Sequence, residues 1–180
     1  MRQSHAFLIV ALAAMTANIA YAEPGLVVIV RHADRGKEPA ADPALTPEGE
    51  RRAADLAQAL ASAKITSIIT TQWRRTRDTA APLAKTLGIE PQVVATQGGD
   101  PAAHIRELVE AVRKQSGNVL VVGHSDTASA LLAALNGPKL PNLCEISFDR
   151  IFVLAYADPK SSFLNLRYGA PSPAPAEGCQ

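Results

Sequence analysis

The sequence predicts an α/β protein: a three-layer α/β/α sandwich with a mostly parallel central sheet. Short apolar runs typical of buried strands alternate with longer amphipathic runs typical of helices. This alternation is expected of parallel strands joined by helices that cover both faces of the sheet. The chain has 180 residues, which is long enough for one domain with its own hydrophobic core.

Residues 1–22 are expected to be a cleavable secretory signal. Arg2 precedes the apolar run "AFLIVALAAM", and Ala20-Tyr21-Ala22 forms a small-residue cleavage pattern. The alternative, an uncleaved membrane anchor, is disfavoured because the run is short for a bilayer span and is followed by the polar Thr16 and Asn18. We therefore expect the protein to be exported, periplasmic or secreted, with no stable membrane anchor after cleavage.

The rest of the sequence divides into a domain at residues 23–169 and a Pro/Ala-rich tail at residues 170–180, which is expected to be flexible. The tail contains Cys179 and the domain contains Cys144, the two cysteines of the chain. An exported chain meets an oxidising compartment, so we expect these residues to form a disulfide that ties the tail to the domain. Their spacing resembles no zinc motif.

Six apolar runs are predicted to be strands, and the last two are expected to pair as a hairpin or at an edge. These runs are Leu26 to Arg31, Ser67 to Thr71, Gln92 to Ala95, Val119 to Gly123, Ile151 to Tyr156 and Phe163 to Tyr168.

Four helices are predicted between the strands, with their ends marked by polar caps, prolines and glycines. The first has Thr46 as its N-cap and Pro47 at its first position, and its buried stripe is Ala53, Leu56, Ala57 and Leu60. The others are expected at Trp73 to Leu87, from Asp100 to near Gly117, and at Thr127 to Leu135.

The predicted mature chain carries no excess of either charge. Arg2 is the one Lys or Arg in the signal, so the 18 basic residues of the full chain become 17, against 17 Asp and Glu. This balance gives no support for a nucleic-acid partner or a membrane-surface patch. The sequence does not indicate an oligomeric state.

Two histidines follow apolar strands in a similar context. His32 follows the strand in "VVIVRHADRG", and His124 follows the strand in "VLVVGHSD". Ligands of open α/β sheets bind at the carboxyl ends of the strands, because loops and helix N-termini converge there. We therefore expect both imidazoles at one edge of the sheet, where they face a common pocket if the two strands are neighbours.

Arg31 and Arg75 add the features of a phosphate site. A guanidinium is always charged near neutral pH and matches phosphate oxygens with paired donors. Arg75 lies in the first turn of the predicted second helix, where the N-terminus also favours an anion. Its neighbours Arg74 and Arg77 are expected to be solvated.

Four motifs together resemble the histidine phosphatase superfamily, in its phosphoglycerate mutase-like branch. They are "RHAD" at Arg31 to Asp34, "LTPEGERRA" at Leu45 to Ala53, "TQWRRTRDTA" at Thr71 to Ala80 and "VVGHSD" at Val121 to Asp126. The family pattern has Arg-His-Gly, Leu-Thr-x-x-Gly, Ser-x-x-x-Arg-x-x-x-Thr-Ala and Gly-His in the same order. The resemblance covers about Leu26 to Gly137.

The resemblance implies a metal-independent phosphatase that hydrolyses phosphate monoesters without a cofactor. His32 would be the nucleophile that becomes phosphorylated, while Arg31, Arg75 and His124 would bind and neutralise the phosphoryl oxygens. Thr71 stands where the family has serine and keeps a hydroxyl, so it is a further substrate-binding candidate.

Two features depart from the family pattern. Ala33 replaces glycine after the first histidine, a change that the turn can absorb. The glutamate that serves as general acid in many members has no clear counterpart. Asp100 and Asp126 are the candidates, although capping of the third helix explains Asp100 equally well.

Other polar and aromatic residues have less specific interpretations. Asp34, Arg35 and Lys37 are candidates for the pocket entrance, with Asp34 as a substrate-binding residue; a solvated loop is the alternative. Trp73 is expected to wall the pocket or to serve in simple packing. His104 is expected to be an ordinary surface or packing residue of the third helix.

Three other functions compete with the phosphatase. A binding module for phosphorylated ligands would keep the pocket without a working acid. A mutase needs a closed pocket, and the chain lacks long insertions to build a lid. A metal hydrolase would use His32, Asp34, His124 and Asp126, but the nearby arginines disfavour a dication.

Overall fold

The computed structural model describes residues 24–96, 98–157, 160–174 and 177–180. The predicted signal, residues 1–22, lies outside the described residues. Within the described ranges, no helix combines the length and apolar character needed to cross a bilayer.

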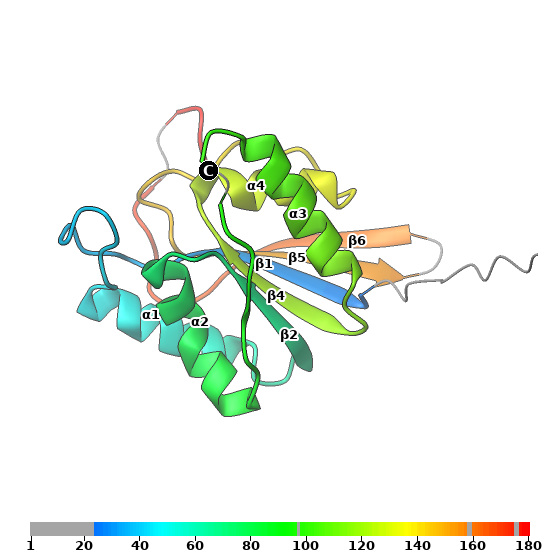
Figure 1. The fold of residues 1–180 in the computed structure, drawn as a ribbon, viewed down its shortest axis with the longest axis horizontal. Helices are drawn as coiled ribbons and strands as arrows, with labels where there is room; N and C mark the ends of the chain where they lie inside the picture. The colour runs from blue at the N-terminus through cyan, green and yellow to red at the C-terminus, as the bar shows by residue number, and fades with distance from the viewer. Residues whose placement is uncertain (1–23, 97, 158–159, 175–176) are drawn as a thin grey trace, which may run out of the picture.

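A six-stranded sheet forms the centre of the molecule, with the strand order β3-β2-β4-β1-β5-β6 (Figure 1). The strands are β1 (Leu26–Arg31), β2 (Ile65–Thr70), β3 (Gln92–Val93), β4 (Asn118–Gly123), β5 (Arg150–Ala157) and β6 (Lys160–Arg167). The first four are mutually parallel, and β5 runs antiparallel to both β1 and β6. The mostly parallel sheet and the final hairpin are both as predicted.

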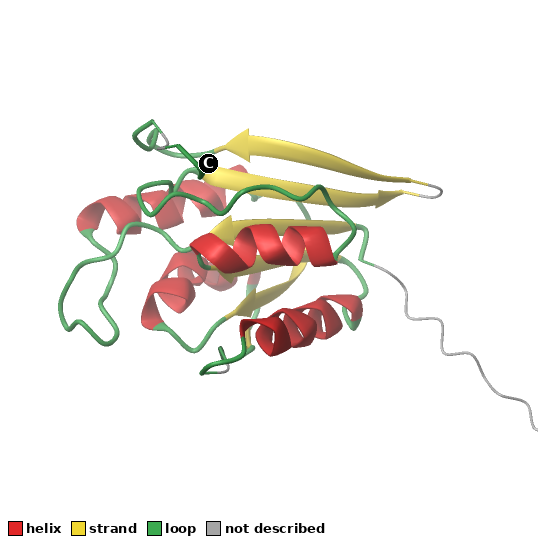
Figure 2. Ribbon diagram, turned by 90° about the horizontal axis from the view of Figure 1, so that it is seen from above, coloured by secondary structure: helices red, strands yellow, loops and turns green. Residues whose placement is uncertain are grey.

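Helices cover both faces of this sheet (Figures 1 and 2). They are α1 (Pro47–Ala59), α2 (Arg74–Leu87), α3 (Pro101–Arg113) and α4 (Ser125–Ala134). Leu56 and Leu83 bring α1 and α2 into one apolar core, while Leu108 and Leu131 bring α3 and α4 into a second core on the opposite face. The three-layer α/β/α sandwich is therefore confirmed.

Several element boundaries differ from the predictions. Helix α4 begins at Ser125 rather than Thr127, because the Thr127 hydroxyl accepts a hydrogen bond from the N–H of His124 (2.7 Å) and stabilises the preceding turn. Helix α3 ends at Arg113, well before Gly117. Strand β3 is shorter than predicted because it pairs only with the end of β2, at Ile69 and Thr70.

The pairing of β1 with β4 places the two histidines at one edge. The register sets Arg31 opposite Gly123, so both strands end at the same level. The N–H of His32 then donates to the carbonyl of Gly123 (2.9 Å). Because β1 and β4 are direct neighbours, the residues that follow them, His32 and His124, emerge side by side.

The start of α1 packs against the turn that follows His32. Thr46 is the N-cap, as predicted, and its hydroxyl accepts a hydrogen bond from Gly49 N–H (3.1 Å). The N–H of Thr46 donates to the Asp34 carbonyl (3.0 Å), and a Cβ on Gly49 would lie 2.0 Å from that oxygen. The glycine of "LTPEGE" is therefore required by the close approach of α1 to the His32 turn.

The tail contains no helix or strand among its described residues, but it contacts the domain at several points. Cys179 forms the predicted disulfide with Cys144, with 5.0 Å between the Cα atoms. Cys144 N–H also donates to the carbonyl of Gln180 (2.8 Å). Nearer its start, the tail accepts a hydrogen bond from Arg52 at the Ala170 carbonyl (2.7 Å).

Candidate active site

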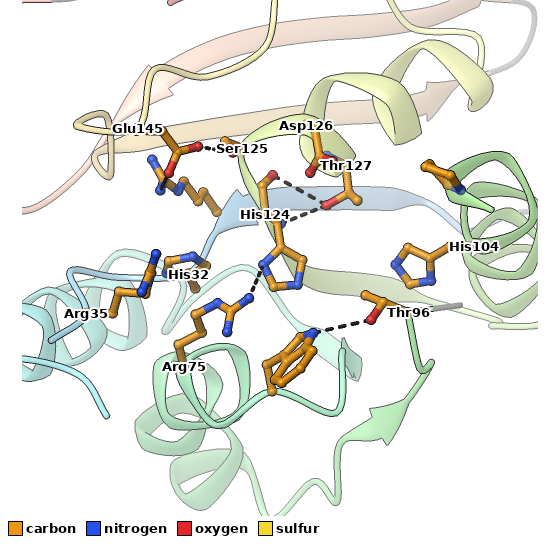
Figure 3. A pocket seen from close by; sticks show the side chains of 13 residues that line it. His32, Arg35, Arg75, Thr96, His104, His124, Ser125, Asp126, Thr127 and Glu145 are labelled. Carbon is orange, nitrogen blue, oxygen red and sulfur yellow. Dashed lines mark hydrogen bonds and ion pairs between the residues drawn. The ribbon is translucent and has the colours of Figure 1, made fainter. Parts of the chain in front are cut away.

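A pocket of about 330 Å³ opens at the carboxyl edge of β1 and β4, between the first turns of α2, α3 and α4 (Figure 3). The residues that line it come from five separate segments of the chain. They are Arg31, His32, Arg35, Trp73, Arg75, Thr96, Pro101, His104, His124, Ser125, Asp126, Thr127 and Glu145.

His32 is held with one ring nitrogen directed toward its own backbone. Its side chain is almost fully buried, and Nδ1 lies 2.8 Å from the carbonyl oxygen of Ala33. A carbonyl only accepts hydrogen bonds, so Nδ1 carries the proton and Nε2 keeps its lone pair. The Ala33 N–H is bound in turn by the Thr79 hydroxyl (2.8 Å), which fixes the turn. His32 is thereby oriented as a nucleophile.

Arg31 is anchored by the loop that precedes β5. Its Nη1 donates to the carbonyl of Cys144 (2.7 Å), and its Nη2 donates to the carboxylate of Glu145 (2.8 Å). The guanidinium also lies over the ring of Phe148, 4.3 Å from the ring centre. These contacts hold a buried cation beside His32, as an anion site requires.

His124 lies beside His32, with 5.5 Å between the ring centres and an edge-to-face arrangement. An N–H of Arg75 faces Nδ1 of His124 (3.4 Å), and Nε2 of His124 faces the Thr71 hydroxyl (3.2 Å). Because an arginine only donates, Nδ1 is the acceptor and Nε2 carries the proton. Thr71 therefore orients His124.

Burial keeps both active-site histidines neutral. It lowers the pKa of His32 to about 2; the Ala33 carbonyl opposes this shift, and the nearby charge of Arg31 adds to it. Burial also lowers the pKa of His124 to about 4; Arg75 adds to this shift and Asp126 opposes it. Near neutral pH, His32 is therefore a free base that can attack phosphorus.

These pKa shifts predict that acid destabilises the fold. Below pH 6.5 the unfolded chain takes up a proton on His32, whereas the folded chain does so only near pH 2, so the free energy of unfolding falls with pH across that window. Each such histidine costs about 2 kcal/mol between pH 7 and pH 5. Urea unfolding at the two pH values is expected to show a decrease about 2 kcal/mol smaller for His32→Asn than for the unsubstituted protein. Equal decreases would contradict the prediction.

Two predicted substrate-binding residues do not line the pocket. Asp34 turns away and accepts a hydrogen bond from Arg52 of α1 (2.7 Å), so it is a structural partner of that helix. Thr71 is buried behind His124 and acts through it. The prediction that these two side chains contact the substrate is therefore wrong.

The two acid candidates have different positions. The carboxylate of Asp100 accepts a hydrogen bond from Ala103 N–H (2.9 Å) and caps α3, which agrees with the capping interpretation. Asp126 lines the pocket and accepts a hydrogen bond from Thr127 N–H (2.7 Å). Of the two, only Asp126 is placed to meet a substrate.

His104 is not an ordinary surface residue. It is 2% exposed and lines the pocket, and neither of its ring nitrogens has a hydrogen-bond partner of normal geometry within the described residues. Trp73 and Arg35 also line the pocket, in agreement with the interpretations given above, whereas Lys37 does not.

Glu145 is a pocket residue that the sequence analysis missed. Its carboxylate pairs with Arg31 and accepts a hydrogen bond from the Ser125 hydroxyl (2.5 Å). Partial burial raises the pKa of Glu145, but the hydrogen bond from Ser125 and the charge of Arg31 outweigh that effect and bring it below its ordinary value. Glu145 lies in an irregular loop far from the recognisable motifs, so no sequence signal identified it.

The residues proposed for a metal hydrolase do not converge. Asp34 is bound to Arg52 outside the pocket, so it cannot join His32, His124 and Asp126 around one ion. Among the described residues, no group of three or more His, Cys, Asp or Glu side chains is arranged to hold a metal. The site is instead built around cationic side chains.

Residues 27–96 match the family model of the histidine phosphatase superfamily (branch 1). This segment includes Arg31, His32 and Arg75. No curated protein matches the chain in sequence.

Solved structures of similar fold cover nearly the whole domain. The protein histidine phosphatase SixA complexed with tungstate has a TM-score of 0.63 at 20% identity, over 79% of this chain and 96% of that chain. A structure described as a phosphohistidine phosphatase SixA from Agrobacterium tumefaciens has a TM-score of 0.58 at 23% identity, over 82% and 99%. One so described from Nakamurella multipartitia has a TM-score of 0.51 at 25% identity, over 81% and 95%.

These structures share the mixed α/β fold with a central sheet flanked by helices. Together with the family model over residues 27–96 and the convergence of Arg31, His32, Arg75 and His124 on one pocket, they identify this chain as a member of the histidine phosphatase superfamily, branch 1.

Proposed function

We propose that this protein is a metal-independent phosphatase that hydrolyses phosphate monoesters through a phosphohistidine on His32. The observation that carries the proposal is the state of His32. Its Nδ1 is committed to the Ala33 carbonyl (2.8 Å), which leaves the Nε2 lone pair free in a pocket lined by two arginines that also contact or flank it. Imidazole, guanidinium and phosphoryl group are complementary partners for phosphoryl transfer.

The first step is an in-line displacement at phosphorus. The His32 Nε2 lone pair forms a P–N bond, the bond from phosphorus to the leaving-group oxygen breaks, and that oxygen keeps the electron pair. Arg31 and Arg75 neutralise the charge on the other phosphoryl oxygens, and a phosphoryl group between Arg75 and His124 replaces their long 3.4 Å contact. The negative charge of the substrate favours the protonated form of His124, which then donates to the phosphoryl group.

The second step releases phosphate. Water attacks phosphorus on phosphorylated His32, the P–N bond breaks, and Nε2 regains its lone pair while the proton of the water passes to phosphate or solvent. The same arginines stabilise this transition state, since its charge lies on the same three oxygens. No step requires a metal ion.

Protonation of the leaving group limits the range of substrates. Asp100 is engaged as the cap of α3, and Glu145 is engaged with Arg31 and Ser125. With two of the three nearby carboxyl groups engaged, the site is suited to leaving groups that need little help. Phosphohistidine is therefore a second candidate substrate, supported also by the names of the SixA structures of similar fold.

We also propose that the protein acts after export. The signal pattern in residues 1–22 supports this, and so does the Cys144–Cys179 disulfide, since such bonds persist in oxidising compartments.

Hydrolysis of 4-nitrophenyl phosphate tests the phosphatase directly. We expect turnover that EDTA leaves unchanged and vanadate inhibits. Brief reaction with a ³²P-labelled substrate, followed by quenching in alkali, is expected to leave label on the protein that mild acid releases, as for a P–N bond. Binding without turnover across a panel of phosphate esters and phosphohistidine would favour the binding module instead.

A further inference from the structure

The pocket extends past His124, away from His32. Figure 3 places His104 on the opposite side of His124 from His32, with Thr96 below it and Asp126 above. We call the part of the pocket formed by Trp73, Thr96, His104 and Asp126 the distal end. The mechanism described above uses none of these four side chains.

His104 shows that the distal end is built to meet a polar group. Its imidazole is 2% exposed, yet both ring nitrogens lack a hydrogen-bond partner of normal geometry within the described residues. A buried polar group without a partner costs about 1–3 kcal/mol, so its retention in a pocket points to a partner supplied by the ligand. Burial lowers the pKa of His104, so the ring is a neutral acceptor near pH 7.

The distal end is also the negative end of the pocket. Arg31, Arg35 and Arg75 surround the phosphoryl end. By contrast, the charges that act on His104 are those of Glu107 and Asp126, both of which favour a positive charge there. Thr96 contributes no charge, and its hydroxyl already accepts hydrogen bonds from Gln72 (2.8 Å) and Trp73 (3.3 Å).

We propose that the distal end binds an ammonium group carried by the leaving group of the substrate, so that the preferred substrates are phosphate esters of amino alcohols. This inference rests on the proposed function, since it assigns the leaving-group side of the same pocket. The ammonium group donates to the free nitrogen of His104 and meets the charge of Asp126. Asp126 then serves as an ionised carboxylate and does not act as the general acid.

The direction of the reaction agrees with this assignment. In an in-line displacement the leaving group departs on the side opposite to the nucleophile, here opposite to Nε2 of His32. His104 and Asp126 lie beyond His124 from His32, within the same cavity. A leaving group that carries a carboxylate would meet Asp126 with a like charge and lose affinity.

Three ligands of similar size test the charge preference. O-phosphoethanolamine, ethyl phosphate and phosphoglycolate share the phosphoryl group and end in an ammonium, a methyl and a carboxylate group. Calorimetric titration of the His32→Ala protein measures their affinities without turnover. We expect O-phosphoethanolamine to bind most tightly and phosphoglycolate most weakly, with dissociation constants that differ about tenfold or more. Added salt should reduce the difference, because Asp126 is exposed.

Substitutions in the same His32→Ala background assign the preference to residues. Asp126→Asn and His104→Phe are each expected to reduce the affinity ratio between O-phosphoethanolamine and phosphoglycolate about tenfold. The control is Glu90→Gln, which removes an exposed carboxylate outside this pocket and should leave the ratio unchanged. Asp126→Asn keeps the test valid if His104→Phe does not fold.

The outcomes separate this inference from the proposed function. Equal affinities, tighter binding of phosphoglycolate, no binding of any of the three ligands, or a ratio that Asp126→Asn leaves unchanged would each overturn the ammonium site. Failure of the unsubstituted protein to hydrolyse 4-nitrophenyl phosphate, combined with the expected affinity ratio, would overturn the phosphatase and leave the ammonium site standing.

Discussion

Replacement of His32 by alanine is expected to lower the turnover of 4-nitrophenyl phosphate by about 10⁴-fold or more, because it removes the nucleophile and not an auxiliary contact. The fold is expected to persist. His32 holds its place mainly through its backbone, whose N–H bonds to Gly123 (2.9 Å), and through the β1–β4 pairing. Initial rates and the thermal midpoint of the purified variant, measured together, check both parts of this prediction.

Added imidazole provides the matched control for His32→Ala. The substitution leaves a space the size of the lost ring, beside Arg31 and His124. Free imidazole in that space can attack phosphorus, so partial recovery of turnover that saturates with imidazole is expected. The labelled phosphate trapped on the unsubstituted protein should be absent from the variant. Full activity of His32→Ala would contradict the mechanism.

Replacement of Arg75 by methionine is expected to lower kcat/KM by about 10²–10³-fold, the usual effect of removing one donor from a preorganised anion site. Arg75 has two roles at once. Its guanidinium is a donor for the phosphoryl group, and its contact with Nδ1 of His124 (3.4 Å) sets the tautomer of that ring. Because the phosphoryl charge is greatest in the transition state, kcat should fall along with the affinity for vanadate.

Arg77→Met is the matched control for Arg75→Met. Arg77 lies on the same helix, is exposed, and does not line the pocket. The same change of charge and side-chain length there should alter kcat/KM by less than about twofold, an effect of long-range charge that salt screens. Similar losses in both variants would show that Arg75 acts only through the net charge of α2.

The part of the site that follows regular elements could be predicted from the sequence. His32 and His124 were identified because each ends an apolar strand, and parallel strands that lie side by side bring their ends together. Arg75 was identified because it begins a helix that follows a strand. In each case a local pattern determines where the residue lies, so the distant partner does not have to be known.

Other residues owe their positions to contacts between distant segments. Asp34 is near His32 in the sequence, but its carboxylate turns toward Arg52 because α1 packs against that turn. Glu145 reaches Arg31 from an irregular loop 114 residues away. His104 is buried only because α3 closes one side of the pocket. Neither periodicity nor capping patterns carry this information.

The disulfide gives the chemistry of the compartment a direct hold on the phosphate site. Cys144 is both the crosslinked residue and the one whose carbonyl accepts the hydrogen bond from Arg31 (2.7 Å), and Glu145, the ionic partner of Arg31, is the next residue. A crosslink of this kind restrains a chain by about 2–4 kcal/mol. A thiol reductant would release that restraint at the very backbone that orients the buried arginine. The oxidation of two sulfur atoms outside the pocket is thus a condition for the arginine to be preorganised, and assembly of the active site is completed only when the tail has been joined to the loop.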